Sequence, residues 1–84
     1  MNNRFNEELA KKIGETLRKI RLDAKTPDGE AVTLTQADVA IDAGISLKHY
    51  QNLELGKCLP SFDVMMRIAR SYGKSFAEFF TSFE

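Results

Sequence analysis

Helix start and stop signals alternate at short intervals from residue 35 onward in this 84-residue sequence. A hydroxyl side chain that can cap a helix N-terminus precedes each of four segments, at Thr35, Ser46, Ser61 and Ser75. Glycines that can end a helix in the left-handed conformation close the first three, at Gly44, Gly56 and Gly73. An acid follows the first and last of these hydroxyl residues by three positions, which is the spacing of a capping box. The pattern predicts four short helices.

A longer helix is predicted before them. Apolar residues recur there at steps of three and four, which is the helical period: Phe5, Leu9, Ile13, Leu17, Ile20 and Ala24. The turn-forming triplet 27–29 stops this pattern. Alternation of period two is confined to the brief segment 30–34. We therefore predict an all-α chain of five helices with essentially no sheet, forming one domain over residues 1–84.

Composition excludes several classes of protein. Twelve Lys and Arg balance twelve Asp and Glu, so the net charge of zero argues against a wholly basic nucleic-acid coat protein. The single cysteine, Cys58, cannot form an internal disulfide, which argues against a disulfide-stapled secreted domain. The polar, acidic start of the chain is unlike a secretory signal, and no apolar run is long enough to span a membrane. We expect a cytoplasmic protein that works at the nucleoid.

No catalytic or metal-binding constellation stands out. The chain has one histidine and one cysteine, and it has no glycine-rich phosphate loop. Ser46 and His49 contain the elements of a hydrolytic pair, but a helix cap explains the serine more simply. We therefore expect no catalytic residue, no metal, no cofactor and no enzymatic activity.

An ordered set of residues gives the chain a resemblance to a known family. The set comprises 17–21, 34–36, 39–40, 44–46, Tyr50, 53–54, Gly56, 60–61, 68–69 and Ser75. With this spacing the chain resembles the Cro and phage-repressor family of DNA-binding domains, the xenobiotic-response-element type, over roughly residues 9–80. The resemblance implies a compact lambda-repressor-like fold whose second and third helices form a helix-turn-helix at about 35–55.

The resemblance also assigns residues to double-stranded DNA. It places residues 46–49 at the leading end of the recognition helix, which enters the major groove. Base contacts are then expected from Leu47, Lys48 and Asn52. Phosphate contacts are expected from Thr35, Gln36, Ser46, His49 and Lys57. The alternative for Lys48, His49 and Asn52 is an ordinary solvated helix face.

A structural ion pair is implied between Arg21 of the first helix and Glu54. Glu54 ends an otherwise apolar face, so it needs a cation if it is buried. The alternative is that both are solvated charges. Tyr50 is assigned to the core by its spacing to Leu53, and not to stacking on bases.

The C-terminal segment carries four of the six phenylalanines. We expect Phe76 and Phe79 to close the core, which leaves Phe80 and Phe83 as an exposed pair at a dimer interface. A symmetric homodimer would present two recognition helices to the half-sites of a palindromic operator, about 34 Å apart.

The connection at 25–34 is longer than the family usually has. It carries Asp28 and Glu30 against Lys25, so a close approach to phosphates is unfavourable there. We expect it to point away from DNA or to serve a protein partner. The leading interpretation is a sequence-specific regulator, most simply a small homodimeric repressor such as a restriction-modification controller, a prophage repressor or an antitoxin. The alternative is a protein-interaction module, or an antitoxin with weak or no DNA binding of its own.

Overall fold

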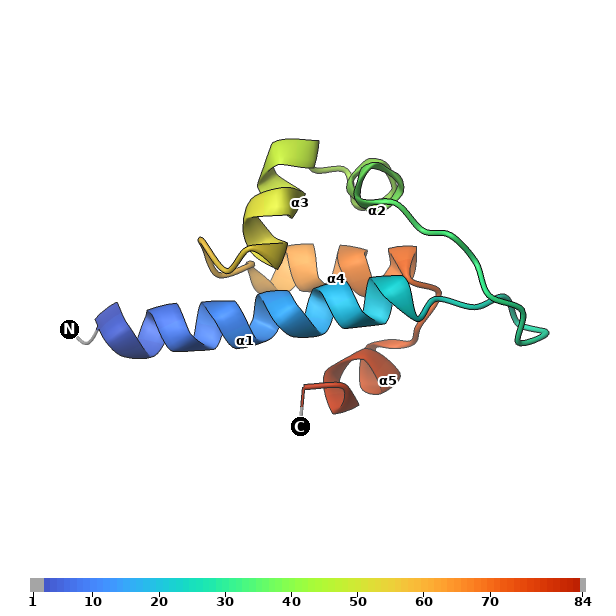
Figure 1. Ribbon diagram of the computed structural model, residues 1–84, viewed down its shortest axis with the longest axis horizontal. Helices are drawn as coiled ribbons and strands as arrows, with labels where there is room; N and C mark the ends of the chain where they lie inside the picture. The colour runs from blue at the N-terminus through green and yellow to red at the C-terminus, as the bar shows by residue number, and fades with distance from the viewer. Residues whose placement is uncertain (1–2, 84) are drawn as a thin grey trace.

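Five helices form the chain over residues 3–83, the part that the computed structural model describes, with side chains described for residues 6–83. In chain order they are α1 Asn3–Leu22, α2 Gln36–Ala43, α3 Leu47–Glu54, α4 Phe62–Ser71 and α5 Phe76–Thr81. Over these residues no strand forms, so the prediction of an all-helical, five-helix fold is confirmed. Figure 1 shows α2 and α3 on one side of the long α1 and α5 on the other.

The short helices begin where the capping residues stand. Thr35, Ser46, Ser61 and Ser75 all have extended backbone, and each side-chain oxygen accepts a hydrogen bond from the backbone N–H three residues on. The boxes of α2 and α5 are complete, because the Asp38 and Glu78 carboxylates accept from the backbone N–H of the capping residues. Gly44 ends α2 in the left-handed conformation, at a φ of 69°. Local signals therefore predict the starts of all four short helices.

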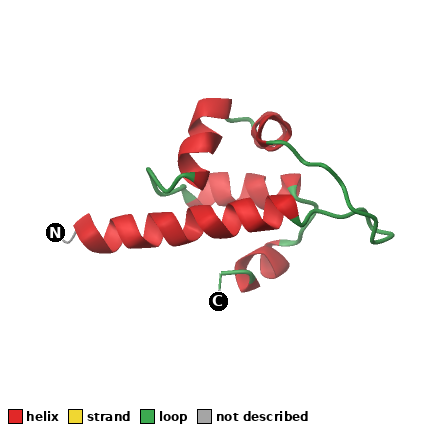
Figure 2. Cartoon of the chain, in the orientation of Figure 1, coloured by secondary structure: helices red, strands yellow, loops and turns green. Residues whose placement is uncertain are grey.

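The core lies where all five helices face one another, and it includes Val39, Ala40 and Ala43 of α2. Its largest fully buried side chains are Tyr50, Phe79, Leu17, Leu53, Ile68 and Val39. Helix α3 packs on α1, and α2 packs on both α3 and α4. The cartoon in Figure 2 shows how this arrangement turns α2 and α3 toward one outer face of the molecule. The predicted core position of Tyr50 is confirmed.

The inner face of α1 differs in part from the predicted one. Leu17 and Ile20 are buried as expected, but Leu9 is exposed while Ala10 and Gly14 are buried. The reason is that α3 crosses α1 at Gly14, so small residues line the contact. Phe5 lies outside the described side chains. The helix also ends at Leu22, two residues before the predicted Ala24.

The aromatic residues of α4 and α5 are arranged differently from the expectation. Phe79 is fully buried as predicted, but Phe76, which was expected in the core, is exposed, and so is Phe62 of α4. Phe80 and Phe83, expected as the exposed pair, are half-buried against the core. Helix periodicity identified the apolar residues correctly. The period within one helix does not show which of its apolar residues a neighbouring helix covers.

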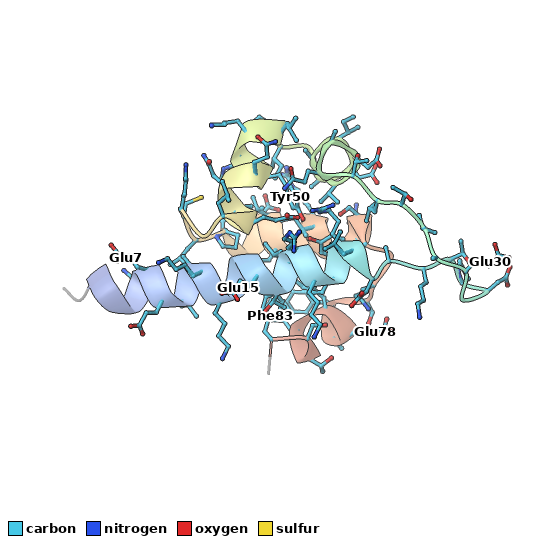
Figure 3. All side chains as sticks on the ribbon, in the orientation of Figure 1. Glu7, Glu15, Glu30, Tyr50, Glu78 and Phe83 are labelled. Carbon is cyan, nitrogen blue, oxygen red and sulfur yellow. The ribbon has the colours of Figure 1, made fainter. Side chains whose placement is uncertain are left out.

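The connection between α1 and α2 is a narrow loop that doubles back on itself. Lys25 and Ala31 form an isolated antiparallel bridge, and the Val32 N–H donates to the Ala24 carbonyl at 3.1 Å. Figure 3 shows Glu30 at the tip of this loop, at the far end of the molecule from the N-terminus. The loop therefore carries its acidic residues away from the packed helices.

Candidate nucleic-acid interface

Helix α3 has one open face and one firmly anchored face. Its first residues, Leu47 and Lys48, are exposed, and the Ser46 side chain caps them. On the inner side Tyr50 and Leu53 are fully buried. Figure 3 shows Tyr50 pointing from α3 into the space between the helices. The helix therefore presents its leading end to solvent from a rigid base.

A chain of hydrogen bonds ties α3 to the core beneath it. The Tyr72 hydroxyl donates to the Leu17 carbonyl at 3.2 Å, which leaves its oxygen to accept from the Tyr50 hydroxyl at 2.7 Å. Burial raises the pKa of both tyrosines, so each hydroxyl keeps the proton that its bond requires. These two hydrogen bonds join residues of α1, α3 and the end of α4. Nothing in the sequence spacing indicated Tyr72 as the residue that they share.

Arg21 and Glu54 form an ion pair at the inner end of α3. Arg21 Nε donates to Glu54 Oε2 at 2.7 Å and Nη2 donates to Oε1 at 3.1 Å, with the two side chains 11% and 3% exposed. Arg21 Nη1 also donates to the Leu34 carbonyl at 3.0 Å. Burial alone would raise the pKa of the Glu54 carboxyl, but the hydrogen bonds and charge of Arg21 outweigh it and hold that pKa below its ordinary value. The pair fixes α3 and the start of α2 against α1.

Gln36 extends this network between α2 and α3. Its amide nitrogen donates to Glu54 Oε1 at 2.9 Å, and its oxygen accepts from the Gln51 side chain at 3.4 Å. The side chain that the sequence assigned to phosphate therefore also braces the two helices of the pair. Gln51 was missed, because nothing in the sequence separates it from the neighbouring solvated positions.

The remaining predicted phosphate residues lie around the two helix starts and just after α3. The Thr35 hydroxyl accepts from the Asp38 N–H, and the Ser46 hydroxyl accepts from the His49 N–H, both at 3.0 Å. Each hydroxyl retains its own hydrogen for donation to an anion. The Thr35 N–H is taken by Asp38 Oδ2, and this backbone hydrogen bond leads the interactions that lower the Asp38 pKa.

Lys57 and Asn52 complete the predicted set. Lys57 is exposed in the turn after α3, where its N–H donates to the Asn52 carbonyl at 2.9 Å. The Asn52 side chain is half-buried, and its Oδ1 is buried without a hydrogen-bond partner among the described residues. Rotation of the amide exchanges oxygen and nitrogen, so this side chain can offer either a donor or an acceptor.

The segment that contains α3, residues 44–60, carries a net positive charge although the whole chain is neutral. Between residues 44 and 60 the charged side chains are Lys48, Lys57 and Glu54, beside the titratable His49. Because Glu54 is neutralised by Arg21, the exposed remainder is basic. Among the residues that the structure describes, no group of three His, Cys, Asp or Glu side chains could hold a metal ion. Nor is any helix described there long and apolar enough to cross a membrane.

Comparison with known proteins supplies the family. A helix-turn-helix family model matches residues 30–79, which is more than half of the chain and includes α2, α3 and α4. No curated protein sequence matches the chain. The matched family is the Cro type, as the resemblance implied, and it is a DNA-binding regulatory family, typically without enzymatic activity. The chain therefore belongs to the Cro-type helix-turn-helix family, whose members bind double-stranded DNA.

Proposed function

We propose that this protein is a sequence-specific transcriptional repressor that binds a palindromic operator as a homodimer. The observation that carries the proposal is the exposed leading end of α3, with Leu47 and Lys48 in solvent above the buried Tyr50 and Leu53. A helix that enters the major groove needs such an end, because its first residues contact the base edges.

Three side chains supply the base contacts. Lys48 donates to guanine O6 and N7, and Leu47 packs against a thymine methyl group. Asn52 lies about one turn further along and offers its amide to adenine or cytosine. Each good contact discriminates against a wrong base by about 1–3 kcal/mol.

Phosphate contacts fix the register of the helix on the duplex. The hydroxyls of Thr35 and Ser46 donate from the two helix starts, and His49 adds a ring N–H donor in the first turn of α3. Lys57 adds a positive charge just after the end of α3. Gln36 adds a phosphate contact from the start of α2 while its amide nitrogen still donates a hydrogen bond to Glu54. These contacts position the protein and carry no sequence information of their own.

The test is a selection of bound fragments from genomic DNA with the purified protein at physiological salt. We expect the wild type to enrich a palindromic motif and the Lys48→Ala/Asn52→Ala variant to lose that motif. As a matched control, Asp28→Ala/Glu30→Ala changes two exposed residues of the loop and keeps the motif. Reporter transcription from the selected sequence then checks repression. Enrichment by the double variant equal to that of the wild type would rule out base contact through α3.

A second function is favoured by the projecting loop. Asp28 and Glu30 are exposed in the loop of residues 25–34, and Figure 3 shows Glu30 at the projecting end of this loop. The chain as a whole has no net charge. Both features suit a protein-interaction module, including an antitoxin that binds its toxin. If a folded wild-type sample enriches no DNA, or binds it with no dependence on salt, this second function replaces the first.

A further inference from the structure

A cavity of about 450 Å³ lies between the second half of α1, the start of the loop that follows it, and α5 with the turn before it. Figure 1 shows α5 on the opposite side of α1 from α2 and α3, so the cavity is separate from the face of α3. Its volume lies in the range of small-molecule sites, which is about 300–1,000 Å³. Ile20 and Tyr72, both buried, give it apolar walls.

Three lysines from three segments line this cavity. Lys19 belongs to α1, Lys25 to the loop and Lys74 to the turn before α5. Neither of the two ion pairs among the described residues involves a lysine, so these ammonium groups have no carboxylate partner there. Lys74 is also half-buried, which limits where its charge can go. Three such charges around one cavity attract a small anion, because each ammonium donates to it as a compact point charge.

Two carboxylates limit the size of that anion. Asp23 and Glu78 line the same cavity, so three lysines against two acids leave its lining with a net charge of +1. The hydrogen bonds from Ser75 and, after them, the charge of Lys74 lower the pKa of Glu78, so this carboxyl stays ionised. A long polyanion would meet both carboxylates as well as the lysines. The lining therefore favours a ligand with one compact anionic group.

The lining also offers acceptors for hydroxyl groups. Thr16 Oγ1 donates its hydrogen to the Lys12 carbonyl at 2.9 Å, and Ser82 Oγ donates to the Glu78 carbonyl at 3.3 Å. Each of these hydroxyl oxygens keeps lone pairs that can accept from a ligand. The carboxylate of Asp23, which is exposed, can accept in the same way. Beside its anionic group, the ligand that fits this lining has hydroxyl donors.

We propose that this cavity binds a small phosphate monoester with a hydroxylated carbon skeleton, such as a sugar phosphate or a nucleoside monophosphate. A phosphate monoester carries nearly two negative charges and three terminal oxygens, one for each lysine, whereas a carboxylate offers one charge and two oxygens. The hydroxyls of the skeleton donate to Asp23, Thr16 and Ser82, and its carbon face covers Ile20 and Tyr72.

NMR titration of the isotope-labelled full chain tests the site. The probes are glycerol phosphate, ribose phosphate and adenosine monophosphate, and the controls are ribose and inorganic phosphate. We expect at least one probe to give saturable shifts at residues 19–25 and 73–78, ribose to give none, and inorganic phosphate to bind at least about tenfold more weakly. The ranking of the three probes identifies the skeleton.

Two outcomes of this titration would overturn the proposal. The site fails if no probe gives saturable shifts at millimolar concentration, or if the shifts spread equally over lysines outside the cavity. The hydroxylated skeleton fails if inorganic phosphate binds as tightly as every probe. The sample contains no DNA, so neither outcome depends on the proposed function of α3.

Two variants assign the binding to this cavity. Lys74→Met removes a charge, keeps an apolar stem and is expected to raise the dissociation constant of the bound probe at least about tenfold. Lys11→Met is the matched control, because Lys11 is an exposed lysine of α1 outside the cavity. Circular dichroism checks that both variants remain folded.

Asp23→Asn separates the two ends of the ligand. It removes a negative charge, so it should bind inorganic phosphate at least as well as the wild type. Its preference for the probe over inorganic phosphate should fall, because the amide is a weaker acceptor for the hydroxyls than the carboxylate. Probe binding that neither Lys74→Met nor Asp23→Asn affects would overturn the assignment of this cavity.

Discussion

Gly14 sits where the backbones of α1 and α3 come closest. A Cβ atom built at this position would lie 2.5 Å from the carbonyl oxygens of both Leu53 and Glu54. Backbone at the end of a helix cannot move aside as a flexible side chain can. The missing side chain of Gly14 therefore allows α3 to pack on α1, and with it the placement of the helix that we propose for the major groove.

Substitution Gly14→Ala should destabilise the fold although alanine favours helix. The helix propensity gained is at most about 1 kcal/mol, whereas overpacking of a closed contact costs typically 1–3 kcal/mol. The alanine Cβ would lie far closer to the Leu53 and Glu54 carbonyl oxygens than van der Waals contact allows. We therefore expect Gly14→Ala to have a lower free energy of unfolding than the wild type, measured in urea. Glu15→Ala, on an exposed neighbour, should change stability by no more than about 0.5 kcal/mol. If Gly14→Ala had a higher free energy of unfolding than the wild type, this would contradict the close approach of α1 and α3.

The Arg21–Glu54 pair should be costly to break from one side and inexpensive to replace as a whole. Removal of one partner leaves a poorly solvated charge, so Glu54→Ala is expected to cost about 3 kcal/mol of unfolding free energy. Arg21→Met/Glu54→Met should recover most of that loss, because apolar residues of similar size need no partner. Denaturant unfolding of Arg21→Met, Glu54→Met and the double variant measures the coupling. Additive losses would show that the two side chains do not depend on each other.

At the scale of the elements, the sequence predicted what is local and missed what depends on packing. The starts of α2 to α5 follow from capping residues that act within three positions, and all four were found. The exposure of Phe62 and Phe76 was not predicted. Their environment depends on where α5 returns to α4, and periodicity within one helix carries no information about that return. The same limit explains why Leu9 was assigned to the inner face of α1.

The short helices should respond to acid through their capping carboxylates. The hydrogen bond from the Thr35 backbone N–H is the largest influence that lowers the pKa of Asp38, and the one from the Ser75 backbone N–H is the largest that lowers the pKa of Glu78. Each folded-state pKa thus lies below its unfolded value. The stabilisation is fully present above the ordinary values near 3.8 and 4.5, and it is lost as the pH falls through the folded values.

Melting temperatures followed from neutral pH downward measure this loss. The wild type should melt at progressively lower temperature once the pH falls below about 4.5. Asp38→Asn/Glu78→Gln should start lower at neutral pH and show a shallower decline. The Glu54 carboxyl, whose pKa is also lowered, contributes the decline that remains in this variant. A double variant as acid-sensitive as the wild type would show that the capping boxes do not contribute.

At the scale of the whole molecule, separation of charge resolves the conflict between a neutral chain and a DNA-binding family. The molecule is 45 Å long, and the acidic loop tip with Glu30 projects at one end, away from α3. The exposed Lys48 lies in the first turn of α3, and the exposed Lys57 lies just after its end. The capping serine predicted the start of this helix, and the family resemblance implied that its leading end faces the DNA. The sequence did not predict that Gln36 would brace α3, because that bond depends on how α1, α2 and α3 meet at Glu54.

Salt dependence of DNA affinity tests this separation of charge directly. Each neutralised phosphate contributes a slope of about −0.9 to the plot of log affinity against log salt concentration. Lys57→Ala should therefore reduce the slope by about one on every sequence, whereas Lys48→Ala should in addition relax discrimination at one base pair. Asp28→Asn/Glu30→Gln makes the loop less acidic and should leave the slope unchanged, since salt screens charges over about 10 Å at 0.1 M. A steeper slope for the loop variant, opposite in sign to the effect of Lys57→Ala, would mean that total charge governs binding, and the assignment of DNA to the face of α3 would fail.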